Sequence, residues 1–193
     1  METVETATAT TTERASIAAG AAAGAVAYVV GYLVTYLWQA GSVEESLQGY
    51  NAIVEFLGGD PIPAWQAVGW LYYNAHNVAF TTPNIGGGRA AQNLVADGNA
   101  SMLLYLVPVV VLLSAGFVVA RNVNASEAEA GARAGVTVAA GYVVLAVVGL
   151  VAFRYSVGDS TVHVDYALGV LLAGIVYPAV FGALGGVLGA VTR

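Results

Sequence analysis

Four long stretches of this chain carry no charged side chain and consist largely of apolar residues. They lie between Arg14 and Glu44, Asp97 and Arg121, Arg133 and Arg154, and Asp165 and Arg193. The hydrocarbon core of a bilayer is about 30 Å thick and needs about 20 apolar residues in a helix to cross it. A charge inside the core is costly, so spans carry their charges at their ends. The pattern predicts an all-α membrane protein with four transmembrane helices, at about 15–39, 100–120, 134–153 and 166–191.

The segment that links the first two predicted spans is the only sizeable part outside the membrane. An apolar stripe recurs there at steps of three and four residues, which is the period of an amphipathic helix. Its members are Val43, Leu47, Tyr50, Val54 and Leu57. A second helix is predicted from Ala64 to about Phe80, and Pro83 with the glycines at 86–88 breaks regular structure after it. Polar residues in this second helix favour an interfacial position, while a re-entrant segment or a fifth span remains an alternative.

The arginines indicate how the chain is oriented, because basic residues beside spans stay in the cytoplasm. With both termini inside, Arg14, Arg121, Arg133 and Arg193 are cytoplasmic. Only Arg89 and Arg154 are then outside. We expect a cell-membrane protein with cytoplasmic termini, a disordered tail over 1–13, and a single membrane domain over 14–193 that includes an extracellular helical loop at 40–99.

Composition narrows the class of protein further. Hydrophobic residues make up 58% of the chain and charged residues only 9%, which is far from the usage of soluble domains. The net charge of -6 argues against nucleic acid as a partner, since phosphate binding needs clustered Arg or Lys. The chain has no cysteine, so disulfides and thiolate chemistry are excluded.

Two resemblances follow from these features. All six basic residues are arginine and none is lysine, and with twelve acidic residues the chain resembles multi-pass membrane proteins of extremely halophilic archaea. Four spans with both termini inside and one large outer loop resemble the topology of claudins and tetraspanins. The loop lies between the first two spans, as in claudins. Val68-Gly69-Trp70 resembles the loop tryptophan motif of claudins, but the cysteine pair of their loop is missing. The resemblance is therefore one of topology only.

Small and aromatic residues mark the predicted helix faces. Glycines four residues apart let another helix approach closely. The glycines predicted to pack helices are Gly20, Gly24, Gly182, Gly186, Gly185 and Gly189. Phenol hydroxyls inside hydrocarbon need hydrogen-bond partners, and they form either polar contacts between helices or the wall of a lipid-binding groove. The tyrosines expected on such a face are Tyr28, Tyr32, Tyr36 and Tyr142.

The linking segment and a short outer loop hold the remaining candidate residues. The candidate partner surface comprises Trp65, Trp70, Tyr72, Tyr73 and His76. His163 and Asp165, with Asp159, fall short of a metal site, and Asp165 is expected to cap the fourth span. We expect no metal and no cofactor.

The motifs of phosphate loops, hydrolases and metalloproteases are absent from the sequence. We therefore expect no enzyme, but a non-catalytic scaffold or subunit of a membrane assembly that contacts membrane lipids and associates with copies of itself or with other membrane proteins. The alternative is a passive channel or transporter subunit for ions or a small neutral or lipidic solute, which a similarity between the openings of helices one and three, at Arg14 and Arg133, would favour.

Overall fold

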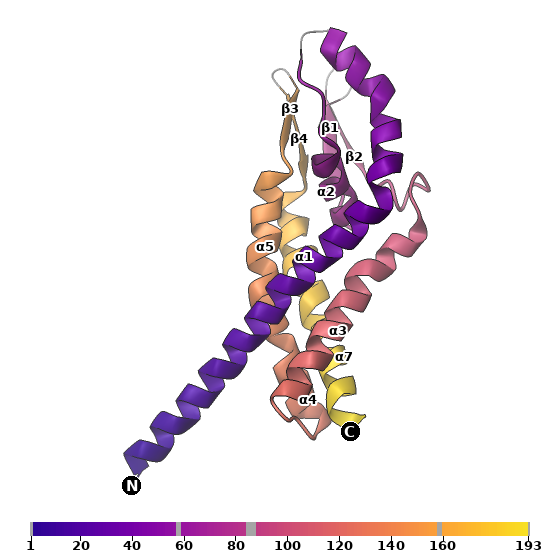
Figure 1. The fold of residues 1–193 in the computed structure, drawn as a ribbon. Helices are drawn as coiled ribbons and strands as arrows, with labels where there is room; N and C mark the ends of the chain where they lie inside the picture. Colours follow the sequence, from indigo (N-terminus) through magenta and orange to yellow (C-terminus); the bar gives the residue numbers. More distant parts are fainter. Residues whose placement is uncertain (1, 57–58, 84–87, 158–159, 193) are drawn as a thin grey trace. The chain divides into compact units, whose positions relative to one another are not determined.

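The computed structural model describes residues 2–56, 59–83, 88–157 and 160–192, and most of them are helical (Figure 1). Within this part of the chain, four helical segments are long and apolar enough to cross a membrane. They are Ile17–Phe56, Met102–Asn122, Ala128–Ala152 and Tyr166–Val191. These segments confirm the expected fold class, an all-α protein with four spans, and coincide with the predicted spans to within a few residues at most ends.

Helix α1 (Glu2–Phe56) is longer than the sequence analysis expected. The predicted first span and the predicted amphipathic helix after it form one uninterrupted helix, because Gly41 alone does not break a helix whose neighbours favour it. The backbone is also helical from Glu2, where a disordered tail was expected. Of the predicted apolar stripe, Val43 and Leu47 pack against a buried core, while Leu57 lies outside the described residues.

The other three spans are each built from shorter pieces. A 3₁₀ turn (Met102–Tyr105) leads into α3 (Leu106–Asn122), and α4 (Ala128–Val136) continues through Thr137 into α5 (Val138–Ala152). The last span runs from α6 (Tyr166–Leu168) through a π-helical segment (Gly169–Val176) to α7 (Tyr177–Val191). Pro178 lies in the first turn of α7 and has no backbone N–H to donate, which accounts physically for the wider π turns before it.

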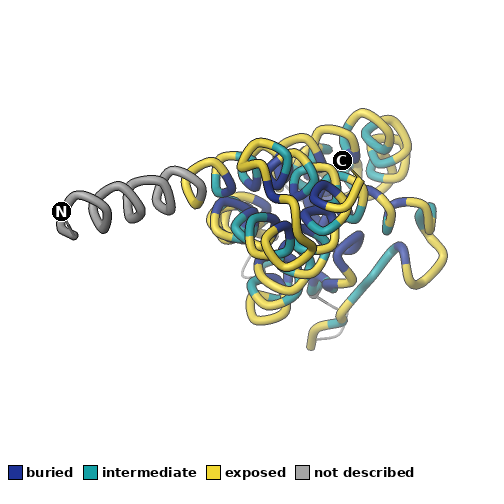
Figure 2. Tube along the Cα trace, turned by 90° about the horizontal axis from the view of Figure 1, so that it is seen from below, coloured by how far each residue is buried: buried dark blue, intermediate teal, exposed yellow. Residues whose placement is uncertain are grey.

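The chain divides into two compact units. The first comprises Met1–Tyr28, Val109–Leu145 and Gly174–Arg193, and the second comprises Val29–Pro108 and Ala146–Ala173. Along the helices, buried and exposed residues alternate turn by turn (Figure 2).

In the first unit, α4 packs on α7 through two pairs of glycines. A Cβ built on Gly186 would fall within 3.0 Å of the Gly131 carbonyl, and one on Gly182 would meet the Gly135 carbonyl equally closely. The reverse also holds, because a Cβ on Gly131 or Gly135 would meet the backbone of α7. Two faces with glycines four residues apart therefore oppose each other, and the helix backbones lie in direct contact.

The remaining predicted packing glycines lie at two further contacts in the same unit. Gly185 and Gly189 of α7 face the carbonyls of Leu113 and Phe117 on α3. Gly20 and Gly24 of α1 face Thr137 and the Val138 carbonyl. The sequence analysis missed the partner glycines, which include Gly116, Gly131 and Gly135.

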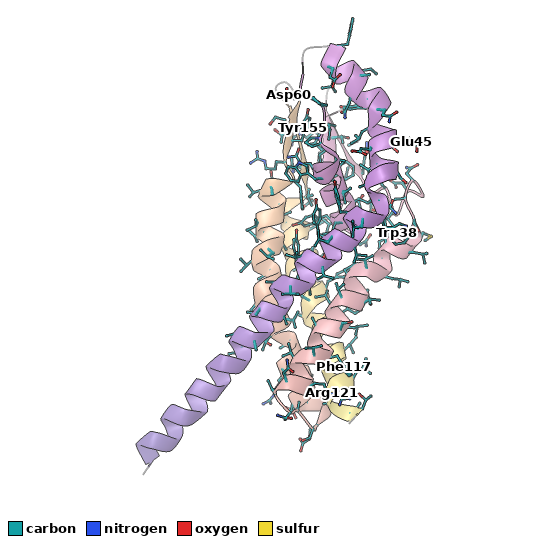
Figure 3. All side chains as sticks on the ribbon, viewed as in Figure 1. Trp38, Glu45, Asp60, Phe117, Arg121 and Tyr155 are labelled. Atoms are coloured by element: carbon teal, nitrogen blue, oxygen red, sulfur yellow. The ribbon has the colours of Figure 1, made fainter. Side chains whose placement is uncertain are left out.

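Within the first unit, Arg121 at the end of α3 hydrogen-bonds Thr192, the residue that follows α7. Its guanidinium donates to the Thr192 carbonyl at 2.7 Å and to the Thr192 hydroxyl at 3.1 Å. The same guanidinium lies 5.0 Å from the centre of the Phe117 ring, and Figure 3 shows the two side chains on neighbouring turns of α3. Such a cation over an aromatic face adds a modest attraction.

The second unit contains a small sheet that the sequence analysis did not predict. Four antiparallel strands lie in the order β2-β1-β4-β3, with β1 (Phe80–Pro83), β2 (Arg89–Gln92), β3 (Tyr155–Val157) and β4 (Ser160–Val164). The pairing of Phe80 with Val164 joins the two hairpins. Figure 1 shows the strands beside α2 (Ala64–Asn74), a helix of 11 residues. At about 16 Å long, α2 is too short to be a fifth span.

Asp165 caps the last span as expected, since its Oδ1 accepts the backbone N–H of Leu168 at 2.9 Å. Replacing it with alanine leaves that N–H without its acceptor. We expect Asp165→Ala to lower the free energy of unfolding by about 1 kcal/mol. Asp165→Asn keeps an acceptor oxygen and is the matched control. Thermal unfolding of the purified chain in detergent measures both, and equal losses in the two variants would contradict the capping role.

Candidate functional site

A cluster of buried aromatic side chains forms the core of the second unit and lies beside a cavity. Trp70 of α2 donates from Nε1 to the Phe153 carbonyl at 2.6 Å. Its ring stacks on Phe80, with 5.2 Å between ring centres. The Tyr73 hydroxyl donates to the Ala146 carbonyl. These contacts fix the orientation of α2 relative to β1 and the end of α5.

The cavity lies between the second half of α1, α2 and the sheet, and its volume is about 860 Å³. That volume falls within the roughly 300–1,000 Å³ typical of small-molecule sites. Apolar side chains make most of its wall, among them Val43, Leu47, Ile62, Leu71, Phe80 and Val162. We refer to it as the α1–α2 pocket. It is the candidate functional site of this chain.

The polar groups of the α1–α2 pocket are uncharged. They comprise Gln39, Ser42, Ser46, Thr82, Gln92 and Asn99. The Gln92 side chain donates to the Thr82 hydroxyl at 3.1 Å, and the Ser46 hydroxyl donates to the Ser42 carbonyl at 2.8 Å. None of the described residues that line the pocket carries a charge, so hydrogen bonding and apolar contact are the chemistry that it offers.

The end of α2 behind the pocket is a buried polar cluster. Asn74 is fully buried, donates to the Val78 carbonyl at 2.8 Å and accepts the Leu94 N–H at 2.9 Å. His76 is also fully buried, and its Nδ1 donates to the Tyr72 carbonyl at 2.8 Å. Burial lowers the pKa of His76 from 6.5 to about 4, a shift that the hydrogen bond to Tyr72 partly opposes. The imidazole is therefore neutral at physiological pH.

A second polar contact ties β3 to the segment after α1. The Tyr155 hydroxyl donates to the Asp60 carbonyl, and Figure 3 labels both residues at the same end of the second unit. Partial burial raises the pKa of Tyr155 above its ordinary value, and the nearby Asp60 carboxylate acts in the same direction. The hydroxyl therefore stays protonated and remains a donor.

Comparison with known proteins assigns a family. The model of a family of unknown function, DUF7978, matches residues 1–193. The chain belongs to this family. No curated protein and no solved structure matches it.

In this DUF7978 member, the predicted partner surface is largely wrong. Trp70, Tyr72, Tyr73 and His76 are buried, and only Trp65 is exposed, at 41%. The physical reason is that α2 packs into the core of the second unit, and its aromatic rings supply the apolar area that this small unit buries. A phenol or an indole is accepted in such a core when its polar atom finds a partner, as the Trp70 and Tyr73 bonds show.

The four predicted tyrosines are divided between the two units. Tyr28 and Tyr142 are buried in the first unit, where their rings meet edge to face at 5.2 Å. In the second unit, the Tyr32 hydroxyl donates to the Trp65 carbonyl at 3.0 Å. Its ring stacks on Phe153, and Tyr36 lies beside it at 6.2 Å. The Tyr32 hydrogen bond is a polar contact of the kind that the sequence analysis expected for these tyrosines.

The loop between α5 and α6 holds no cation site among the described residues, and Asp159 lies outside them. His163 Nε2 accepts from the Arg89 guanidinium at 3.1 Å, and Nδ1 donates to the Val164 carbonyl. Its ring stacks on Tyr166. His163 therefore joins β4 to β2 and to the start of α6.

Sequence reasoning missed the walls of the α1–α2 pocket that the sheet contributes. Phe80 and Val162 come from the two hairpins, which are far apart in the sequence. The alternation of apolar and polar residues around Gly158-Asp159 is typical of a hairpin and could have predicted β3 and β4. It could not have predicted that this hairpin pairs with Phe80.

Proposed function

We propose that this chain is a non-catalytic integral membrane subunit that associates with another membrane protein. One observation carries the proposal, an exposed apolar stripe at the end of α1. Tyr50, Ile53 and Phe56 follow each other at steps of three, which places them on one helix face. Their exposed fractions are 46%, 62% and 89%.

The stripe lies beyond the length of helix that a bilayer requires. A span needs about 20 apolar residues, and the apolar run from Ala15 to Gln39 supplies them. Glu44, Glu45 and Glu55 follow, and carboxylates of this kind favour water. Three apolar side chains exposed in succession outside the hydrocarbon favour burial against a partner.

The charges around the stripe indicate that its binding partner is a different protein and not a second copy of this chain. The second half of α1 carries three carboxylates and no basic residue, so two copies that pack along this helix would place like charges together. A partner helix with an apolar face and flanking Lys or Arg is complementary in charge. Because α1 runs without a break from the span to the stripe, that partner is best held in the same membrane.

The proposal includes the membrane in which the chain lies and its orientation in that membrane. The distribution of arginines supports cytoplasmic termini, and the acidic, lysine-free composition supports a cell membrane exposed to high salt. The stripe then lies on the outer side. This arrangement keeps the resemblance to claudin-like topology.

Substitution within the stripe tests the proposal. We expect native mass spectrometry of the chain in mild detergent to show a fixed-stoichiometry complex with a second integral membrane protein. Phe56→Asn should reduce the bound fraction at least tenfold, because it removes the most exposed apolar side chain of the stripe. Gln48→Asn, at an exposed position of the same helix away from the stripe, is the matched control and should leave the fraction unchanged.

Salt and self-association complete the test. Raising the ionic strength should weaken the complex, since the proposed charge complementarity is screened. A complex that contains only copies of this chain would contradict the choice of partner. Equal binding by Phe56→Asn and the unmodified chain would overturn the role of the stripe.

A further inference from the structure

We infer that the α1–α2 pocket binds an uncharged amphiphile of the membrane, a lipid with an apolar tail and a small hydrogen-bonding head. This inference goes beyond the proposed assembly role and does not depend on it, because the pocket and the stripe use different residues apart from Tyr50, which borders both. Its basis is the combination of a rigid apolar wall, a neutral polar edge and a position at the end of a span.

The apolar wall is preformed. Leu71, Phe80 and Val162 are almost fully buried, and they reach the pocket from α2, β1 and β4. The hydrogen bond to Phe153 and the stacking on Phe80 hold the Trp70 indole in place. A ligand that enters therefore meets fixed apolar surface and requires little reordering, which favours affinity.

The polar edge follows one face of α1. Gln39, Ser42 and Ser46 recur at steps of three and four, next to Val43 and Leu47 of the apolar wall. A carboxylate or ammonium placed here would lose hydration without an opposite charge to pair with. A hydroxyl or carbonyl of a neutral head would instead find amide and hydroxyl groups of matching polarity.

The position of the pocket indicates where the ligand comes from. Gln39 ends the apolar run of the first span, so the pocket begins where the hydrocarbon region ends. A membrane amphiphile reaches this level with its head already at the interface and its tail in the lipid. A water-borne ligand would instead have to bring its apolar part through solvent.

Quenching of Trp70 fluorescence provides a direct readout, since this residue lines the pocket. The chain has three tryptophans, and the pair Trp38→Phe and Trp65→Phe leaves Trp70 as the only one. The full chain in detergent micelles is titrated with diacylglycerol that carries dibrominated acyl chains. Dibrominated phosphatidylglycerol serves as the charged comparison, and a short-chain quinone serves as a second neutral probe.

We expect saturable quenching by at least one neutral probe, at a mole fraction at least tenfold below that at which phosphatidylglycerol quenches. Ser46→Phe and Ser42→Phe each place a ring in the pocket from an exposed helix position, and they should weaken this quenching at least fivefold. Gln48→Phe adds the same ring to α1 outside the pocket lining and should change the quenching less than twofold. The neutral probe that reaches half-maximal quenching at the lower mole fraction carries the head group that the pocket prefers.

Three results would overturn the inference. Equal quenching by diacylglycerol and phosphatidylglycerol would show that Trp70 meets bulk lipid. Quenching that Ser46→Phe and Ser42→Phe leave unchanged would place the ligand elsewhere. The absence of quenching by both neutral probes would show that the pocket does not take an uncharged amphiphile.

Discussion

Gly186→Ala will lower the free energy of unfolding of the first unit by about 1–3 kcal/mol, the range for inserting a methyl group into a close-packed contact. A Cβ at this position would meet the Gly131 carbonyl oxygen well within 3.0 Å, and the Gly135 Cα would lie 3.0 Å from it. Both obstacles belong to the backbone of α4, which cannot move aside as a flexible side chain can. The helices α4 and α7 must therefore separate, and the opposing contact at Gly182 is weakened with them.

Gly49→Ala is the matched control for this prediction. A Cβ built on Gly49 meets nothing within 4 Å, although this glycine also lies inside a helix. Alanine should therefore stabilise the chain, by about 0.5–1 kcal/mol, because it restricts the unfolded chain and favours the helix. Thermal unfolding in detergent, followed by circular dichroism, compares the two variants. Changes of the same sign in both would contradict the view that backbone contact makes Gly186 necessary.

The four spans could be predicted from the sequence because the bilayer acts on each segment separately. An apolar run without charges must be a helix in hydrocarbon, where the backbone has no other hydrogen-bond partners. The predicted fourth span at 166–191 coincides with the observed segment for this reason. The predicted third span begins six residues later than the observed one, since α4 continues past Arg133 to Ala128 and its charged residues belong to the helix end.

The parts that the sequence did not predict depend on contacts between distant segments. The glycines of α7 were recognised, but a spacing of four residues does not name the opposing helix, and Gly131 and Gly135 were missed. The sheet has the same origin, because the pairing of β1 with β4 joins Phe80 to Val164, with two spans between them in the sequence. Local sequence patterns can predict the two hairpins but not that β1 of one pairs with β4 of the other.

The candidate site was likewise predicted only in part, where local sequence patterns determine it. The apolar stripe of the second half of α1 was predicted from its period, and Val43 and Leu47 do line the α1–α2 pocket. The aromatic residues of α2 were assigned to a partner surface, because aromatic side chains are frequent at interfaces as well as in cores. Burial decides between the two, and burial depends on the sheet that the sequence analysis lacked.

The buried imidazole of His76 makes the stability of the second unit depend on pH. Its pKa is about 4 in the folded chain and 6.5 in the unfolded chain, so the unfolded chain binds the proton more readily. The contribution of the neutral His76 imidazole to the free energy of unfolding is fully present above pH 6.5. It is lost as the pH falls towards 4. We expect a loss of about 2 kcal/mol between pH 7.5 and pH 5, and about 3 kcal/mol at pH 4, from 1.36 kcal/mol per unit of pKa shift.

Denaturation of the purified chain at a series of pH values between 7.5 and 5 measures this loss above the range in which most carboxylates titrate. His76→Gln cannot take up the proton and should abolish most of the pH dependence, although the variant is less stable at pH 7.5. His163→Gln removes the chain's other histidine and is the comparison variant, measured over the same pH series. If His76→Gln unfolds with the same pH dependence as the unmodified chain, the sensitivity lies elsewhere, and the neutral imidazole behind the α1–α2 pocket is not what ties the stability of this unit to pH.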